Sequence, residues 1–226
     1  FCDYAALPTD APRANIPSLV EKEVIRYQEE ASSAEVADRR ISDAIQLIYD
    51  NRLLETGSAG SVSDFFELTK NIAGTRDAES FLRTAYTRER NNEIINSLPK
   101  GTASDRDIAI FSAGFPPDNA SIAEILEFLQ ASQRMNSYVQ DESLLLESFI
   151  QNQIESGGTQ DVSMSGFRAR RRAYGEARKA LREREEFLNL QVQSNELTLA
   201  QAKALMDEEV EGFRVNFGFT PTIYLD

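Results

Sequence analysis

Large apolar residues recur every seven positions over the last third of the chain, at Phe167, Tyr174, Leu181 and Leu188. Because two turns of an α-helix take about seven residues, these side chains share one side of a helix. A second apolar series follows a short polar turn and contains Leu199, Ala202, Met206, Val210 and Phe213. The two series predict an antiparallel helical hairpin over residues 159–214.

The three- and four-residue spacing of apolar side chains extends back through residues 18–158, with a pause at residues 31–35. It predicts an all-α fold of about seven to nine helices, in which a helical bundle precedes the hairpin. Residues 1–17 contain three prolines and little periodicity, so they are expected to form an extended lead-in. Residues 215–226 are rich in aromatic and β-branched residues, which favours an extended tail.

Two strings, Gly60–Gly74 and Gly101–Gly114, share a Gly-x-x-Ser-Asp start and are 41 residues apart at that start. We interpret both as boundaries between helices, with a duplicated helical unit as an alternative. A nucleotide-binding loop is not expected at Lys100–Thr102, because the order of glycine and lysine is reversed and no strand precedes it. Capping boxes are expected at Ser104 with Asp107 and at Ser121 with Glu124.

The composition excludes several kinds of site. The chain has no histidine and one cysteine, Cys2, so Cys/His zinc sites, Ser-His-Asp triads and internal disulfides are excluded. No cofactor is expected. No apolar run approaches the ~20 residues of a membrane-spanning helix. The first residue, Phe1, favours a processed product or part of a longer chain.

An arginine-rich segment lies within the first predicted helix of the hairpin. Residues 168–184 hold eight basic and two acidic residues, a net +6 in a chain whose total is −13. Arg171, Arg172, Arg178 and Arg182 are expected on the outer faces of this helix. Three interpretations remain open: a solvated face paired with glutamates, contact with an acidic partner or second copy, and contact with nucleic acid. The candidate contact residues are Arg168, Arg170, Arg171, Arg172, Arg178, Lys179, Arg182 and Arg184.

The other candidate functional residues lie in the C-terminal tail and among the glutamates. Phe217, Phe219 and Tyr224 are expected to dock, either in the chain's own core or on a neighbouring copy. Glu124 and Glu147 lie beside apolar residues, where burial would suit a general acid, but a cap or an ion pair is favoured. A carboxylate-based hydrolase is therefore the least favoured function, and no catalytic, metal or cofactor residue is assigned.

The segment Leu98–Tyr138, with its Gly-x-x-Ser-Asp start and Gly-Phe-Pro turn, resembles helical internal virion or DNA-ejection proteins of short-tailed bacteriophages. The resemblance implies a structural, non-enzymatic role in a homo-oligomer located in the virion. It implies portal or tail proteins as partners, and DNA as a further one. The alternative is a cytoplasmic helical adaptor that binds a protein partner.

Overall fold

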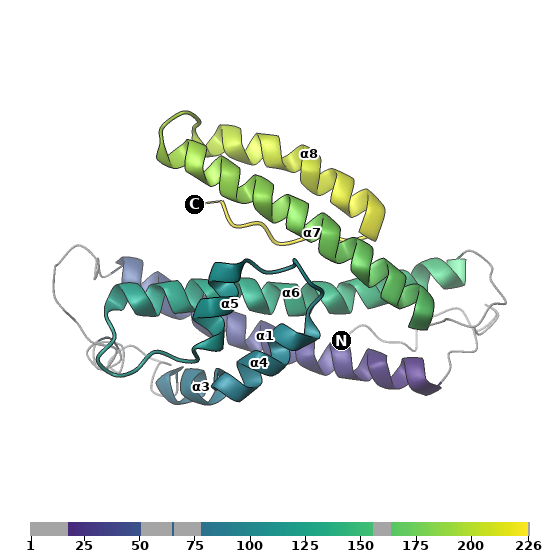
Figure 1. The fold of residues 1–226 in the computed structure, drawn as a ribbon, viewed down its shortest axis with the longest axis horizontal. Coiled ribbons are helices and arrows are strands. Elements are labelled where there is room, and N and C mark those ends of the chain that lie inside the picture. The colour runs from purple at the N-terminus through teal and green to yellow at the C-terminus, as the bar shows by residue number, and fades with distance from the viewer. Residues whose placement is uncertain (1–17, 51–64, 66–77, 156–163, 226) are drawn as a thin grey trace.

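The computed structural model describes residues 18–50, 65, 78–155 and 164–225 (Figure 1). Within those ranges the chain forms seven helices and no strand, which confirms the all-α prediction. The predicted lead-in 1–17 and the boundary string around Gly60, Ser63 and Gly74 lie outside the described residues. The helices are α1 (Ser18–Asp50), α3 (Ala78–Ala85), α4 (Arg88–Ser97), α5 (Asp105–Ser112), α6 (Ile122–Glu155), α7 (Met164–Gln193) and α8 (Leu199–Phe217).

Helices α1 and α6 are the longest elements of the body and run antiparallel along each other (Figure 1). The expected pause at residues 31–35 does not occur, because α1 is continuous from Ser18 to Asp50. The buried side chains Ala34, Ala37 and Ile41 keep the three- and four-residue spacing through this stretch. Packing therefore outweighs the weak helix preference of the two serines there.

The short helices α3, α4 and α5 cover one side of the α1–α6 pair (Figure 1). The stretch from Phe81 to Ile95 is divided between α3 and α4, because the helix breaks before Thr87, whose hydroxyl caps α4. Ser104 caps α5 by accepting a hydrogen bond from the Asp107 amide, yet the Asp107 carboxylate does not return to the cap. At the start of α6 the box between Ser121 and Glu124 is complete.

Helices α7 and α8 form an antiparallel pair, and the end of the pair that carries their connecting turn stands away from α6 (Figure 1). A complete capping box of Thr198 and Gln201 starts α8. The predicted boundary at residue 214 is wrong, since α8 continues to Phe217. Gly218, with φ +87°, is the left-handed C-cap, and the rings of Phe213 and Phe217 pack one turn apart at 4.6 Å.

Two apolar clusters form the core. One joins α1, the short helices and the first half of α6, and includes Phe111, Leu129 and Tyr138. The other joins the second half of α6 to α7 and α8, and includes Leu145 and Tyr174. Between them lies a band of buried polar residues, which we name the polar seam: Asn136, Ser137, Asp141, Glu142, Ser143 and Arg178. Asp141 and Glu142 of this seam each pair with an arginine of α7.

Candidate functional site

The predicted apolar stripe of α7 is buried as expected. Phe167, Tyr174, Leu181 and Leu188 are all buried. Charged residues lie on the same face of α7, each four positions after an apolar one: Arg178 and Glu185 are buried, and Arg171 is half-buried. The prediction that Arg178 lies on an outer face is wrong, because only 1% of it is exposed. The candidate site is thus the set of arginines on α7, some of which are buried in the core, such as Arg178, and some exposed to solvent, such as Arg172.

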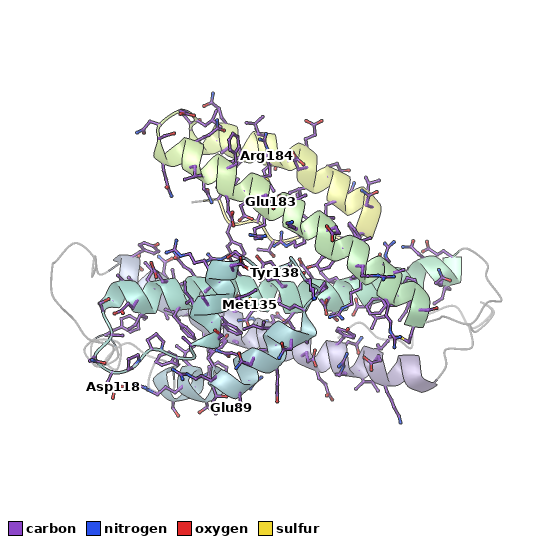
Figure 2. The ribbon with its side chains drawn as sticks, viewed as in Figure 1. Glu89, Asp118, Met135, Tyr138, Glu183 and Arg184 are labelled. Carbon is purple, nitrogen blue, oxygen red and sulfur yellow. The ribbon has the colours of Figure 1, made fainter. Side chains whose placement is uncertain are left out.

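Arg178 joins α7 to α6 and to the tail. Its Nε lies 3.7 Å from Asp141 Oδ2, and its Cζ lies 4.9 Å from the centre of the Tyr138 ring. Figure 2 shows Tyr138 between α6 and the hairpin. A second guanidinium nitrogen donates to the Thr222 carbonyl at 2.7 Å. One cation of α7 therefore contacts both α6 and the tail.

Asp141 has an unusual environment for a carboxylate. It is buried in the middle of α6, and Tyr174 donates a hydrogen bond of 3.2 Å to its Oδ2. Burial raises the pKa of Asp141 to about 7, against the opposing effects of Arg178 and Tyr174. Burial likewise raises the pKa of the neighbouring Glu142, although Arg171 counteracts it. Each of these buried acids is held by one arginine of α7.

Arg171 and Arg170 are also engaged within the chain. Arg171 forms a bidentate pair with Glu142, both hydrogen bonds measuring 2.8 Å, and donates to the Ser97 carbonyl. Arg170 donates to the carbonyls of Asn216 and Phe217, each at 3.1 Å. Those carbonyls are at the C-terminal end of α8, where a cation is favourable. Both arginines therefore link α7 to neighbouring helices by hydrogen bonds.

The remaining predicted contact residues divide into two groups. Lys179, Arg182 and Arg184 form ion pairs with Glu183, Glu186 and Glu209 at 3.8, 3.1 and 3.6 Å. Such partly exposed pairs contribute little stability. Arg168 and Arg172 are exposed and make no hydrogen bond or ion pair with any residue that the structure describes. Of the eight predicted residues, these two are available to a ligand.

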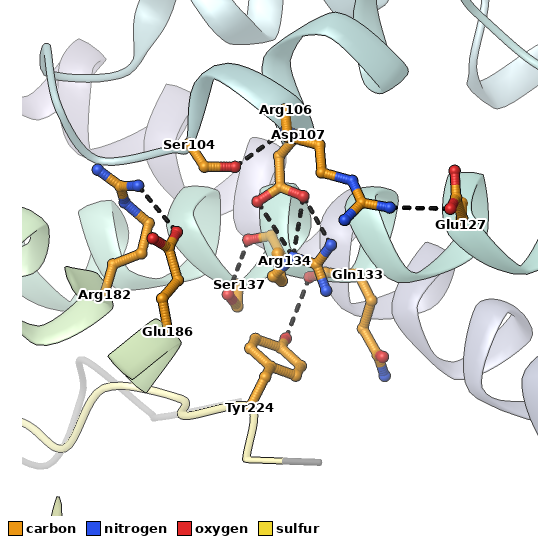
Figure 3. A network of polar contacts seen from close by, with 10 residues as sticks. All are labelled: Ser104, Arg106, Asp107, Glu127, Gln133, Arg134, Ser137, Arg182, Glu186 and Tyr224. Atoms are coloured by element: carbon orange, nitrogen blue, oxygen red, sulfur yellow. Dashed lines mark hydrogen bonds and ion pairs between the residues drawn. The ribbon is translucent and has the colours of Figure 1, made fainter. Parts of the chain in front are cut away.

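The predicted docking residues of the tail all pack against their own chain. The rings of Phe217 and Phe219 lie 6.0 and 6.4 Å from that of Tyr174. Tyr224 is held at three points: its amide donates to Glu185, its carbonyl accepts from Asn189, and its hydroxyl donates to the Gln133 carbonyl at 3.2 Å (Figure 3). These contacts correspond to the core interpretation of the tail.

A second group of charges lines a groove of about 680 Å³ between α5, α6 and α7. Arg134 binds Asp107 through Nε and Nη2, at 3.0 and 2.6 Å from Oδ1 (Figure 3). Arg106 pairs with Glu127 at 2.8 Å and is exposed. Five acids and three arginines line this groove, so its lining has a surplus of negative charge and does not suit an anionic ligand.

Sequence reasoning missed the buried acids. Glu147 is exposed, and Glu124 is exposed in its capping box, where hydrogen bonds from Ser121 lower its pKa. In the described ranges no group of three histidine, cysteine, aspartate or glutamate residues could hold a metal ion. Among the described helices none has the length and apolarity needed to span a bilayer.

Comparison of the chain with protein-family models, with curated proteins and with solved structures finds no match. The function is therefore inferred from the residues and contacts of this chain.

Proposed function

We propose that this protein is a non-enzymatic structural component of a bacteriophage particle that acts by packing its helices against other copies and other virion proteins. The observation that carries the proposal is the hairpin tip, which we define as Phe187, Leu190 and Leu199. These large apolar side chains lie in the last two turns of α7 and at the first residue of α8, and Leu190 is 64% exposed. The tip projects from the body (Figure 1), where apolar surface favours association.

The rest of the hairpin is fixed firmly enough to present that tip. Arg170 connects α7 to α8. Arg171 connects it to α4 and α6, and Arg178 connects it to α6 and the tail. Bidentate and buried pairs of this kind restrict geometry more than they add stability. A rigid arm with an apolar end suits a protein whose role is to fit against neighbours.

The phage setting rests on the resemblance over Leu98–Tyr138. In the structure this segment covers α5 and the first half of α6, including the caps at Ser104 and Ser121. We therefore propose that the protein is located in the virion, with portal or tail proteins and DNA as its neighbours. Mass spectrometry of purified particles from the source of the sequence tests it, and absence from the particles would leave a cytoplasmic helical adaptor as the better explanation.

The buried acids also support a structural role. Asp141 and Glu142 are each 3% exposed, and arginines of α7 cover them. A general acid has to reach its substrate, whereas these carboxylates face other helices. Turnover of a peptidoglycan or glycoside substrate that is abolished by Asp141→Asn would overturn the non-enzymatic assignment.

The assembly is tested by sedimentation velocity. The wild-type chain is expected to sediment as an oligomer, and Phe187→Gln with Leu190→Gln is expected to shift it toward the monomer. The matched control is Ile25→Gln with Val36→Gln on α1, because those side chains are 51% and 46% exposed but lie outside the tip. A monomeric wild type, or equal effects of both double variants, contradicts the proposal.

A further inference from the structure

The N-terminal half of α7 borders a hollow of about 650 Å³ whose lining is rich in cations. We name it the basic hollow: Pro99, Lys100, Ser165, Arg168, Arg171, Arg172 and Glu176. Arg171 is neutralised by Glu142, which leaves Lys100, Arg168 and Arg172 against the single acid Glu176. Neither these three cations nor Glu176 forms an ion pair with a residue that the structure describes. The hollow therefore has a surplus of positive charge.

The loop that carries Lys100 is held close to α7. A Cβ atom added to Gly175 would lie 3.0 Å from Pro99 Cβ and 3.2 Å from the Lys100 carbonyl oxygen. Gly175 thus allows an approach that any other residue would hinder. Arg171 also donates to the Ser97 carbonyl, just before the loop. The backbone at Lys100 is fixed beside Arg168 and Arg172 by these two contacts.

Arg168 and Arg172 are four residues apart on α7, so their guanidinium groups are neighbours and repel each other. An oxyanion between them removes this repulsion and accepts hydrogen bonds from both guanidinium groups. The oxygens of phosphate match the paired N–H donors of a guanidinium group. We propose that the basic hollow binds a phosphate group, either free in solution or carried by a nucleic-acid strand. The contacts come from side chains, in contrast to a nucleotide-binding loop.

The net charge of −13 does not prevent this binding. At physiological ionic strength the Debye length is about 8 Å, so exposed acids beyond that distance are largely screened. The electrostatic potential that an anion meets at the hollow is then set mainly by the nearby cations. The inference goes beyond the proposed assembly, since it requires neither the hairpin tip nor a second copy.

Thermal unfolding with sodium phosphate, compared with sodium chloride at equal ionic strength, tests the site. The wild-type midpoint is expected to rise and saturate with phosphate, because a ligand that binds only the folded state stabilises it. Arg168→Gln with Arg172→Gln is expected to abolish the rise. The control, Arg39→Gln with Arg106→Gln, removes the same charge at side chains that are 72% and 73% exposed, and it should retain the rise.

The source of the phosphate is distinguished with a fluorescent oligodeoxythymidylate. If strand phosphates are the ligand, binding competes with free phosphate, and log K falls with log salt with a slope of about −2 for three contacts to a single strand. If free phosphate is the ligand, the midpoint rises and the oligonucleotide does not bind. No rise with phosphate, an equal rise in both double variants, or binding of an acidic peptide but of no phosphate would overturn the inference. Oligomerisation of the Arg168/Arg172 variant is expected to be unchanged, which separates this test from that of the tip.

Discussion

The guanidinium of Arg178 lies over the ring of Tyr138, with Cζ 4.9 Å from the ring centre, and this contact joins α7 to α6 within the core. A cation over an aromatic face is attracted to it, the more so when water is excluded. Asp141 and the Thr222 carbonyl supply its other contacts. The charge is therefore compensated by three groups that come from two different segments of the chain.

Above about pH 7, where Asp141 is ionised in the fold, Arg178→Gln is expected to lower the free energy of unfolding by about 3–5 kcal/mol, because it leaves this carboxylate buried without its cation. Urea denaturation measures the change. Arg178→Met combined with Asp141→Asn is expected to cost less than Arg178→Gln, since no isolated charge remains. Arg172→Gln is the control, and its effect is expected to stay within about 0.5 kcal/mol. An Arg178→Gln protein as stable as Arg172→Gln contradicts the burial of Arg178.

Stability is expected to fall as the pH rises from about 4 to about 7. The pKa of Asp141 is 3.8 in an ordinary environment and about 7 in the fold, so between these values the native state binds more protons than the unfolded state. The free energy of unfolding then decreases with pH, by up to about 1.4 kcal/mol per unit for one proton. Asp141→Asn should flatten this slope and exposed Glu147→Gln should keep it, as followed by denaturation at fixed pH values. If the free energy of unfolding of the wild type increases over this pH range, the raised pKa of Asp141 is contradicted.

Two arginine pairs in the groove of Figure 3 are expected to differ in their contribution to stability. The Asp107 side chain is 5% exposed, whereas the side chains of Arg106 and Glu127 are 73% and 51% exposed. Arg134→Met leaves Asp107 unpaired and should cost about 2–3 kcal/mol, below the fully buried range because Arg134 is partly exposed. Arg106→Met should cost less than about 1 kcal/mol. Equal losses in chemical denaturation would show that burial of the acid is not the deciding factor.

Gly212 in α8 and Gly218 at its C-cap are expected to respond in opposite ways to substitution by alanine. Gly212 is in the helix and an added Cβ would meet nothing within 4 Å, so Gly212→Ala should stabilise by about 0.5–1 kcal/mol. Gly218 has φ +87° and an added Cβ would overlap Ser148 Oγ. Gly218→Ala should therefore destabilise by about 1–2 kcal/mol or more. The thermal midpoints of the two variants, measured by calorimetry, should lie on either side of the wild-type value.

The heptad pattern predicted the helices of the hairpin and their buried apolar face, because apolar burial is what drives a helix to pack. The same pattern contained a signal for the charged residues on this face. Arg171, Arg178 and Glu185 also recur every seven residues, and each is four positions after an apolar stripe residue. Expecting charged residues to face solvent led to the outer-face assignment of Arg178, although the spacing itself placed it in the interface.

Other features had no signal in the spacing. Asp141 and Glu142 are buried because α7 crosses α6 there, and a tertiary crossing cannot be predicted from the periodicity of one helix. The basic hollow depends on Lys100, which is 68 residues before Arg168 and is brought there by the close contact at Gly175. The order and type of the elements follow from local chemistry, whereas the partners of individual charges follow from the way the elements meet.

Residues 219–225 pack against the hairpin (Figure 1), and this has a consequence for synthesis on the ribosome. Helices α1 and α3–α6 precede the hairpin and share one apolar cluster, so they can collapse while later residues are still in the exit tunnel. Arg178 emerges before Thr222, the carbonyl that it contacts. Until Thr222 is translated, Arg178 lacks this hydrogen bond, so the buried guanidinium acquires its full set of contacts only after the rest of the hairpin has formed.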